Sequence, residues 1–115
     1  MVSSYVPEAG DIVFLDFDPQ VGHEQAKRRP ALVLTDGRYN GSSGLAVVCP
    51  LTSKRTPYPF ALPVNVAGVE GAILVDQLKS LDWKGRRAEF HSKAAARMLT
   101  KVRQYIGVLL SIPAA

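Results

Sequence analysis

The sequence predicts a mainly β or α+β domain, a small barrel of five to seven short strands followed by one C-terminal α-helix. Three observations predict this fold class. Short apolar runs separated by glycine, proline and asparagine turn signals fill residues 10–91. Apolar residues then recur with a helical period over residues 93–110. The length of 115 residues suits one domain, so residues 1–115 are expected to fold as a single unit.

The first two strands are expected on either side of a polar loop. A strand over residues 11–17 follows Gly10 and ends before Pro19, because proline cannot donate a ladder hydrogen bond. Residues 20–29 have no apolar periodicity and are expected to form an exposed loop. The apolar run at residues 30–35 then predicts a buried strand.

The middle of the chain alternates turn signals with further strands. Residues 36–44 contain Asp-Gly and Asn-Gly pairs and are expected to be turns. A third strand is expected over residues 45–51, and residues 58–64, interrupted by two prolines, are expected to form an edge strand. A fifth strand starts at residues 72–75 and can run on toward Leu81, and a short sixth strand can follow residues 86–89.

The C-terminal segment has the pattern of one amphipathic helix over residues 93–110. Ser92 is the expected N-cap. The apolar positions recur at three- and four-residue steps: Ala95, Met98, Leu99, Val102, Ile106 and Leu109. This stripe is expected to face the core. Tyr105 and Leu110 lie near it and could extend it toward a partner subunit.

The residue inventory excludes several classes of site. The single cysteine, Cys49, cannot form an internal disulfide and is expected to be a small buried apolar residue. His23 and His91 are far apart and lack ligand-spaced partners, so no metal is expected. No glycine-rich phosphate loop or serine nucleophile elbow is present, and no cofactor is expected. No signal peptide or membrane-spanning stretch is visible, so a cytoplasmic location without membrane contact is expected.

Charge is unevenly distributed along the chain. The formal net charge is +4, yet residues 1–26 carry five acidic side chains and no lysine or arginine. Residues 79–103, beginning with Lys79, carry eight basic side chains against two acidic ones. A basic region of this kind suits a polyanion or an acidic peptide. Charge alone leaves an ordinary solvated surface equally open.

The loop before the second strand gathers groups suited to phosphoryl chemistry. His23 and Glu24 can move protons when their pKa values are tuned. Arg28 and Arg29 follow closely, and a guanidinium offers a fixed fork of donors to phosphate oxygens. On spacing alone, a solvated polar loop remains the alternative.

Further residues could contact the phosphates and bases of a nucleic acid, although each also has a structural alternative. Two hydroxyls and two cations follow the third strand and could bind phosphate or cap a turn: Thr52, Ser53, Lys54 and Arg55. Gln77 could read a base edge or make a strand-end hydrogen bond. Phe17 and Trp83 could stack on bases or pack in the core.

Taken together, these residues resemble the MazF/PemK family of toxins, and within it the MazF branch. The resemblance covers nearly the whole chain. The motifs that carry it are Gly10-Asp11-Ile12-Val13, Asp16-Phe17-Asp18-Pro19, Gly22-His23-Glu24-Gln25, Arg29-Pro30-Ala31-Leu32-Val33-Leu34, Pro50-Leu51-Thr52, Tyr58-Pro59-Phe60 and Asp76-Gln77-Leu78-Lys79-Ser80-Leu81-Asp82-Trp83.

The resemblance implies a function and a set of partners. It implies an SH3-like barrel with a C-terminal helix, acting as a homodimeric toxin of a type II toxin–antitoxin system. Such a toxin cleaves single-stranded RNA, chiefly mRNA, and is held inactive by an antitoxin with an acidic, disordered tail. Cleavage is expected to need no metal, because the ribose 2′-hydroxyl attacks its own 3′-phosphate and leaves 2′,3′-cyclic phosphate and 5′-hydroxyl ends.

Matching positions carry the family's catalytic roles to Glu24, Arg29 and Thr52. His23 occupies a variable position and is a second candidate for proton transfer. Ser53 stands where a second threonine would be familiar. Two other readings remain: a toxin of the same fold that poisons DNA gyrase, and a non-enzymatic SH3-like module that binds nucleic acid or peptide.

Overall fold

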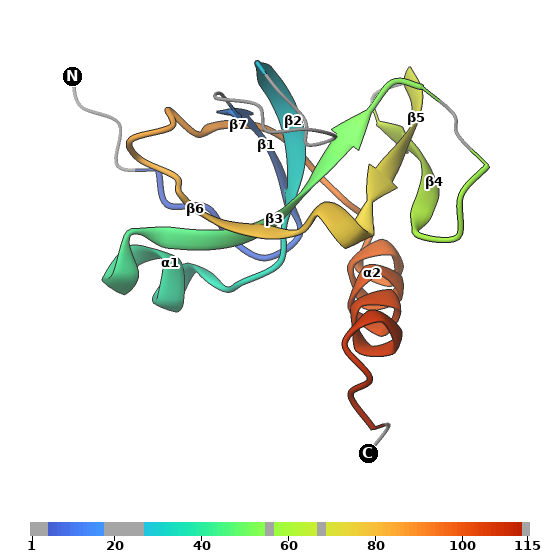
Figure 1. The fold of residues 1–115 in the computed structure, drawn as a ribbon. Helices are drawn as coiled ribbons and strands as arrows, with labels where there is room; N and C mark the ends of the chain where they lie inside the picture. Colours follow the sequence, from blue (N-terminus) through green and yellow to red (C-terminus); the bar gives the residue numbers. More distant parts are fainter. Residues whose placement is uncertain (1–4, 18–26, 55–56, 67–68, 114–115) are drawn as a thin grey trace.

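The computed structural model describes residues 5–17, 27–54, 57–66 and 69–113. These residues form seven strands, two α-helices and one turn of 3-10 helix (Figure 1). In chain order the elements are β1 (Asp11–Asp16), β2 (Arg28–Val33), α1 (Gly37–Ser43), β3 (Leu45–Thr52), β4 (Ala61–Val66), β5 (Val69–Leu74), η1 (Val75–Gln77), β6 (Lys79–Asp82), β7 (Glu89–Lys93) and α2 (Ala96–Leu109). The predicted fold class, short strands in a partly closed barrel with a C-terminal helix, is confirmed.

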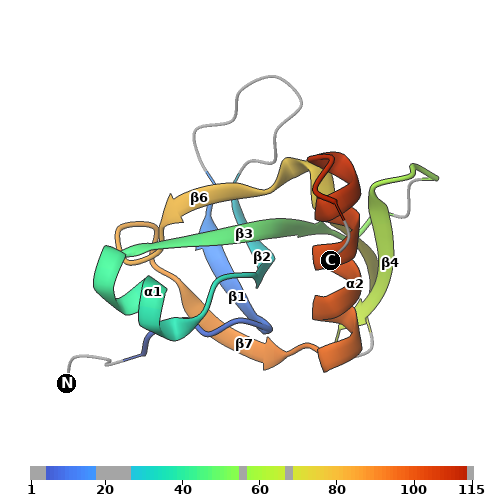
Figure 2. The same ribbon diagram turned by 90° about the horizontal axis from the view of Figure 1, so that it is seen from below.

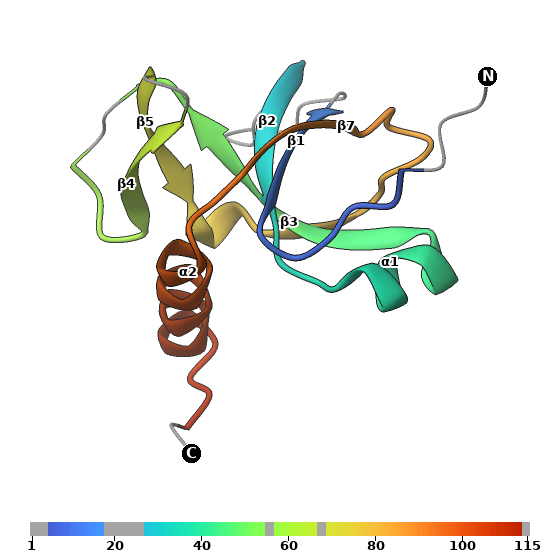
Figure 3. The ribbon, with the colours of Figure 1, turned by 180° about the vertical axis from the view of Figure 1, so that it is seen from behind.

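The strands form one antiparallel sheet in the order β4-β5-β3-β2-β1-β7, with β6 paired to β3. The long strand β3 holds the sheet together. It pairs with β2 along one side, and with β6 and then β5 along the other. Figure 3 shows β7 running beside β1 and leading into α2, which packs at the β4–β5 end of the sheet, away from α1 (Figures 1 and 2).

Strand alternation divides the core between the two faces of the sheet. One cluster of buried side chains contains Leu32 and Ile73 and is covered by α2 through Val102. The other contains Leu15 and Val33. Because side chains alternate along a strand, successive residues of β1 and β2 enter different clusters. Register is therefore fixed on both faces.

The turns predicted over residues 36–44 are wrong, because this segment forms α1. Asp36 is its N-cap, and its carboxylate accepts a hydrogen bond of 3.0 Å from the Tyr39 amide. Gly44 ends the helix in the left-handed conformation at φ 75°. Asn40 is fully buried and donates to the Pro7 carbonyl at 2.7 Å. Aspartate, asparagine and glycine favour helix ends as well as turns, so their presence did not separate the two.

The other differences concern where elements begin and end. Strand β2 begins at Arg28, inside the predicted loop, since it continues to pair with β1. The run from residue 72 toward Leu81 is broken by η1 into β5 and β6. Ser92 is not the N-cap of α2: it lies in β7 opposite Ile12, and Ala95 occupies the N-cap position.

Within the residues described, neither helix combines the length and the apolar character needed to cross a membrane.

Candidate functional site

Two of the predicted catalytic residues lie at the same end of the β2–β3 ladder. Arg29 is the second residue of β2 and pairs with Leu15 of β1. Thr52 is the last residue of the antiparallel neighbour β3. The pairing of β2 with β3 ends at Ala31 and Pro50. Arg29 and Thr52 each lie two residues beyond this last pair, where Thr52 pairs with Ala72 of β5. Both residues therefore lie at the same end of the β2–β3 ladder.

The Thr52 side chain is partly exposed and tied to the turn that follows β3. Its Oγ1 accepts a hydrogen bond of 3.2 Å from the Lys54 amide. Ser53 and Lys54 are exposed beside it. On the other side, Gly71 approaches so closely that a Cβ there would lie 2.2 Å from the Thr52 carbonyl oxygen. Because Gly71 has no side chain, β5 can pass this close to Thr52.

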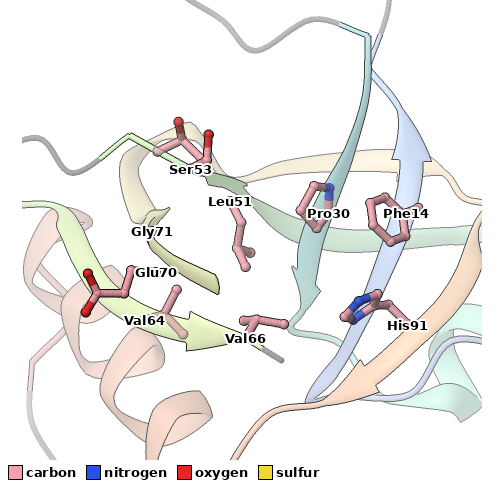
Figure 4. A pocket seen from close by; sticks show the side chains of 10 residues that line it. Phe14, Pro30, Leu51, Ser53, Val64, Val66, Glu70, Gly71 and His91 are labelled. Atoms are coloured by element: carbon pink, nitrogen blue, oxygen red, sulfur yellow. The ribbon is translucent and has the colours of Figure 1, made fainter. Parts of the chain in front are cut away.

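A pocket of about 190 Å³ opens next to Thr52, and we call it the β3-edge pocket (Figure 4). It is lined by Phe14, Pro30, Leu51, Thr52, Ser53, Val64, Val66, Glu70, Gly71 and His91. Its walls are mostly apolar, and polar groups stand at its rim. Figure 4 shows the rings of Phe14 and Pro30 side by side, with the imidazole of His91 next to Phe14.

His91 reaches this pocket through an irregularity in β7. Ile12 pairs with Ser92 and Val13 pairs with Phe90, which leaves His91 as the extra residue of a β-bulge. Bulges redirect side chains in this way. The His91 ring packs edge-on against Phe14 with centroids 5.2 Å apart, and its Nδ1 lies 2.8 Å from the Ser92 hydroxyl.

An ion-pair network closes the same face of β1 beyond Phe14. Asp16 lies 2.8 Å from Arg87 and 3.2 Å from Arg28, and Arg28 also contacts Glu89 at 3.3 Å. Hydrogen bonds from Arg87 and then Arg28 hold the pKa of Asp16 below its ordinary value, although partial desolvation opposes this. Arg28, predicted to bind RNA, is thus engaged with carboxylates and joins β2 to β7.

Phe17 is a corrected prediction. Its ring was a candidate for base stacking, but only 2% of the residue is exposed and it packs with Leu15 and Ala31. A ring buried to this degree has no face to offer a base. Trp83 is half-buried, and its Nε1 donates to the Asn40 carbonyl at 2.9 Å, which assigns it to packing.

The remaining candidates are dispersed or outside the described residues. Gln77 ends η1, and Lys79 begins β6 opposite Val48, on the flank of β3 that faces away from β2. Three predicted site residues, His23, Glu24 and Arg55, lie outside the described residues. Their roles stay predictions.

Residues 18–26, which include His23 and Glu24, lie outside the described residues, but the residues on either side of them are in contact. The Phe17 amide donates to the Lys27 carbonyl at 2.8 Å, and Asp16 pairs with Arg28. This contact lies two residues before Arg29 along the chain. Sequence reasoning overlooked Phe14 and His91 as residues that line the pocket. The imidazole was the one available signal, and it was weighed only as a metal ligand.

The described residues hold no cluster of three or more metal-ligating side chains. Cys49 is fully buried, as predicted, and burial raises the pKa of its thiol to about 12, with the negative charge of Asp76 adding to the effect. The reactive thiolate form of Cys49 is therefore scarce at neutral pH.

Comparison with known proteins gives one consistent result. Residues 8–110 match the family model described as PemK-like, MazF-like toxin of type II toxin–antitoxin system. The chain is 39% identical over 110 residues to the endoribonuclease toxin MazF of Escherichia coli K12, covering 96% of this chain and 99% of that protein. The crystal structure of MazF from Deinococcus radiodurans superposes with a TM-score of 0.89 at 49% identity, covering 95% of this chain and all of that one. A MazE–MazF complex from the same organism superposes with a TM-score of 0.85 at 49% identity, covering 96% and 100% of the two chains.

Proposed function

The chain belongs to the PemK-like, MazF-like toxins of type II toxin–antitoxin systems and is an endoribonuclease toxin. We propose that it cuts single-stranded RNA where β2 begins and β3 ends. The observation that carries this proposal is that Arg29 and Thr52 lie at the same end of the β2–β3 ladder. A guanidinium and a hydroxyl that meet there can hold the oxygens of one phosphate.

The proposed reaction uses the substrate's own nucleophile. The ribose 2′-oxygen forms a bond to the adjacent phosphorus while the bond from phosphorus to the 5′-oxygen breaks. The products are a 2′,3′-cyclic phosphate and a 5′-hydroxyl. Two protons must move, one off the 2′-hydroxyl and one onto the departing 5′-oxygen. Catalysis then rests on alignment of these atoms and on charge stabilisation at the phosphate.

Each role follows from the chemistry of the side chain. Arg29 stays protonated, so it binds the phosphate and offsets the charge that grows in the transition state. The Thr52 hydroxyl donates a hydrogen bond to the same oxygens. Glu24 or His23 takes the 2′-proton.

The partners follow from charge and exposed apolar surface. A cognate antitoxin is the expected inhibitor, in line with the MazE–MazF complex of Deinococcus radiodurans, and an acidic tail suits the basic residues of 79–103. Exposed apolar side chains at the end of α2 suit a homodimer contact: Val108, Leu110 and Ile112. A toxin that acts on mRNA works in the cytoplasm, which is where we place it.

Purified protein incubated with a long RNA in EDTA tests the proposal. The expected result is cleavage at defined sites, with cyclic phosphate and 5′-hydroxyl ends, and no cleavage where the scissile nucleotide is 2′-deoxy. Persistent cutting at a 2′-deoxy nucleotide would contradict the proposed nucleophile. Loss of cutting in EDTA would contradict the metal-independent reaction.

A further inference from the structure

We propose that the β3-edge pocket holds one nucleobase of the RNA next to the cut, and that His91 determines which base is accepted. The inference rests on the proposed function, because the pocket shares Thr52 with the phosphate site. It adds a specificity-determining residue on β7, a strand that contributes nothing to the proposed phosphate site.

The dimensions of the pocket suit a single flat ring. Its volume of about 190 Å³ is below the roughly 300 Å³ at which drug-sized sites begin. Phe14, Leu51 and Val66 supply apolar walls. Polar groups at the rim leave one edge of an inserted ring able to form hydrogen bonds. A base inserted edge-first buries its faces against carbon and keeps its polar edge at the mouth.

The position of the pocket fits a nucleotide bound at the proposed site. Thr52 and Ser53 form part of the rim, so a phosphate held by Thr52 lies at the mouth. A base is joined to its own phosphate by one ribose. The base on one side of the scissile phosphate therefore reaches the pocket without stretching the chain.

The position and orientation of the His91 ring suit contact with such a base. The bulge brings its side chain to the pocket, and the Ser92 hydroxyl at 2.8 Å and the Phe14 ring at 5.2 Å fix its orientation. Among the described residues, no partner bonds its Nε2, and the residue is exposed. An oriented ring with one nitrogen facing outward can both stack on a base and hydrogen-bond its edge.

The lining favours a base over the acidic tail of an antitoxin. Among the described residues that line the pocket there is no lysine or arginine, so the pocket offers acidic side chains no ion pair. The rings of Phe14 and His91 offer faces on which a base can stack. The occupant we infer is therefore RNA.

The test is a coupling measurement on an uncleavable RNA. After the cleavage site is mapped, oligoribonucleotides carry a 2′-deoxy scissile nucleotide and a single abasic site at each neighbouring position. At one position the abasic site should weaken binding to the wild-type protein about tenfold, as expected for a lost stacking contact. His91→Ala should weaken binding of the intact oligonucleotide by a similar factor. The abasic site should then cause no further loss of affinity in that variant. His91→Phe should restore most of the affinity and change the preferred base.

Phe90→Ala is the matched control. Phe90 precedes His91 on β7 and is exposed, but it packs against Tyr5 instead of Phe14. This variant should keep both the wild-type affinity and the wild-type abasic loss.

Equal abasic losses in the wild type and His91→Ala would overturn the inference while cleavage by the wild type leaves the proposed function standing. Weaker binding of the antitoxin to His91→Ala, with unchanged RNA coupling, would assign the pocket to the protein partner instead. A wild-type protein that neither binds nor cuts RNA would overturn the proposed function itself, before any variant is compared.

Discussion

Arg29 carries the largest single effect expected at the residue scale. Arg29→Ala should lower the single-turnover rate of RNA cleavage by about 100-fold or more, because losing one preorganised donor to a transition state costs on the order of 3 kcal/mol. The cleavage rate of Arg29→Lys should lie between those of the wild type and Arg29→Ala, since lysine keeps the positive charge but not the paired donors of arginine. Arg38, exposed on α1, offers a matched arginine for the control variant Arg38→Ala. Cleavage by Arg29→Ala at the wild-type rate would remove this residue from the mechanism.

Cys49 gives a second residue-scale prediction, about protection of a side chain. The folded protein should react very slowly with iodoacetamide at pH 8, because the thiol is fully buried and its pKa is raised to about 12. In guanidinium chloride the thiol should react at the rate of a free cysteine. Mass spectrometry of the alkylated protein checks both rates, and rapid labelling of the folded state would contradict the burial.

At the scale of elements, the approach of β5 to β3 determines where Thr52 lies. Gly71→Ala places a methyl group 2.2 Å from the Thr52 carbonyl oxygen, so one of the strands must shift. We expect a loss of stability of about 1–3 kcal/mol together with a reduced cleavage rate. Denaturant unfolding and single-turnover cleavage measure the two effects.

Gly107→Ala is the matched glycine control. Gly107 lies within α2, and an added Cβ there meets nothing within 4 Å. The change should raise stability by about 0.5–1 kcal/mol, since alanine is the better helix former. It should leave cleavage unchanged. If Gly71→Ala were as stable and as active as Gly107→Ala, the tight approach of β5 to Thr52 would be wrong.

Elements with one strong signal could be predicted from the sequence, and those governed by distant partners could not. The runs that became β1 and β3, and the stripe of α2, follow directly from apolar periodicity. The helix α1 was not predicted because tertiary contacts hold its polar residues, above all the hydrogen bond from Asn40 to the Pro7 carbonyl. The sequence around α1 does not contain Pro7, so it cannot indicate this contact.

The candidate site divides in the same way. The positions of Arg29 and Thr52 at strand ends could be predicted from the runs that follow or precede them. The burial of Phe17 and the β-bulge at His91 depend on how β1 and the residue after it meet segments that lie elsewhere along the chain, at Lys27 and in β7. Such register details cannot be read from one strand alone.

For the whole molecule, two carboxylates link folding to pH. Asp11 is buried, and although desolvation opposes its ionisation, hydrogen bonds from Lys93 at 2.7 Å, Tyr5 at 2.6 Å and the Glu8 amide at 3.0 Å lower its pKa. The pKa of Asp16 is also lowered, by Arg87 first. Both groups therefore stay ionised in the folded state at a pH where the unfolded chain binds protons.

Acid should consequently unfold the protein through these groups. Their contribution is complete above the ordinary aspartate pKa of about 3.9 and is lost as pH falls through the lower folded-state pKa values. The melting temperature should fall steeply between about pH 5 and pH 2, and less steeply in Asp16→Asn, which has no carboxylate to protonate at that position. Calorimetry across this range checks the slope. An identical slope in Asp16→Asn would show that the Asp16 ion pairs do not contribute.

The central claim is that Arg29, at the start of β2, and Thr52, at the end of β3, act on the same phosphate. A double-mutant cycle of Arg29→Ala and Thr52→Val, followed by single-turnover cleavage of one RNA under EDTA, tests it most directly. Two groups that hold one phosphate should be coupled, so the double variant should be much less impaired than the product of the two single effects. Rate losses that simply multiply would show that the two side chains act independently, and would contradict a shared phosphate at this edge of the sheet.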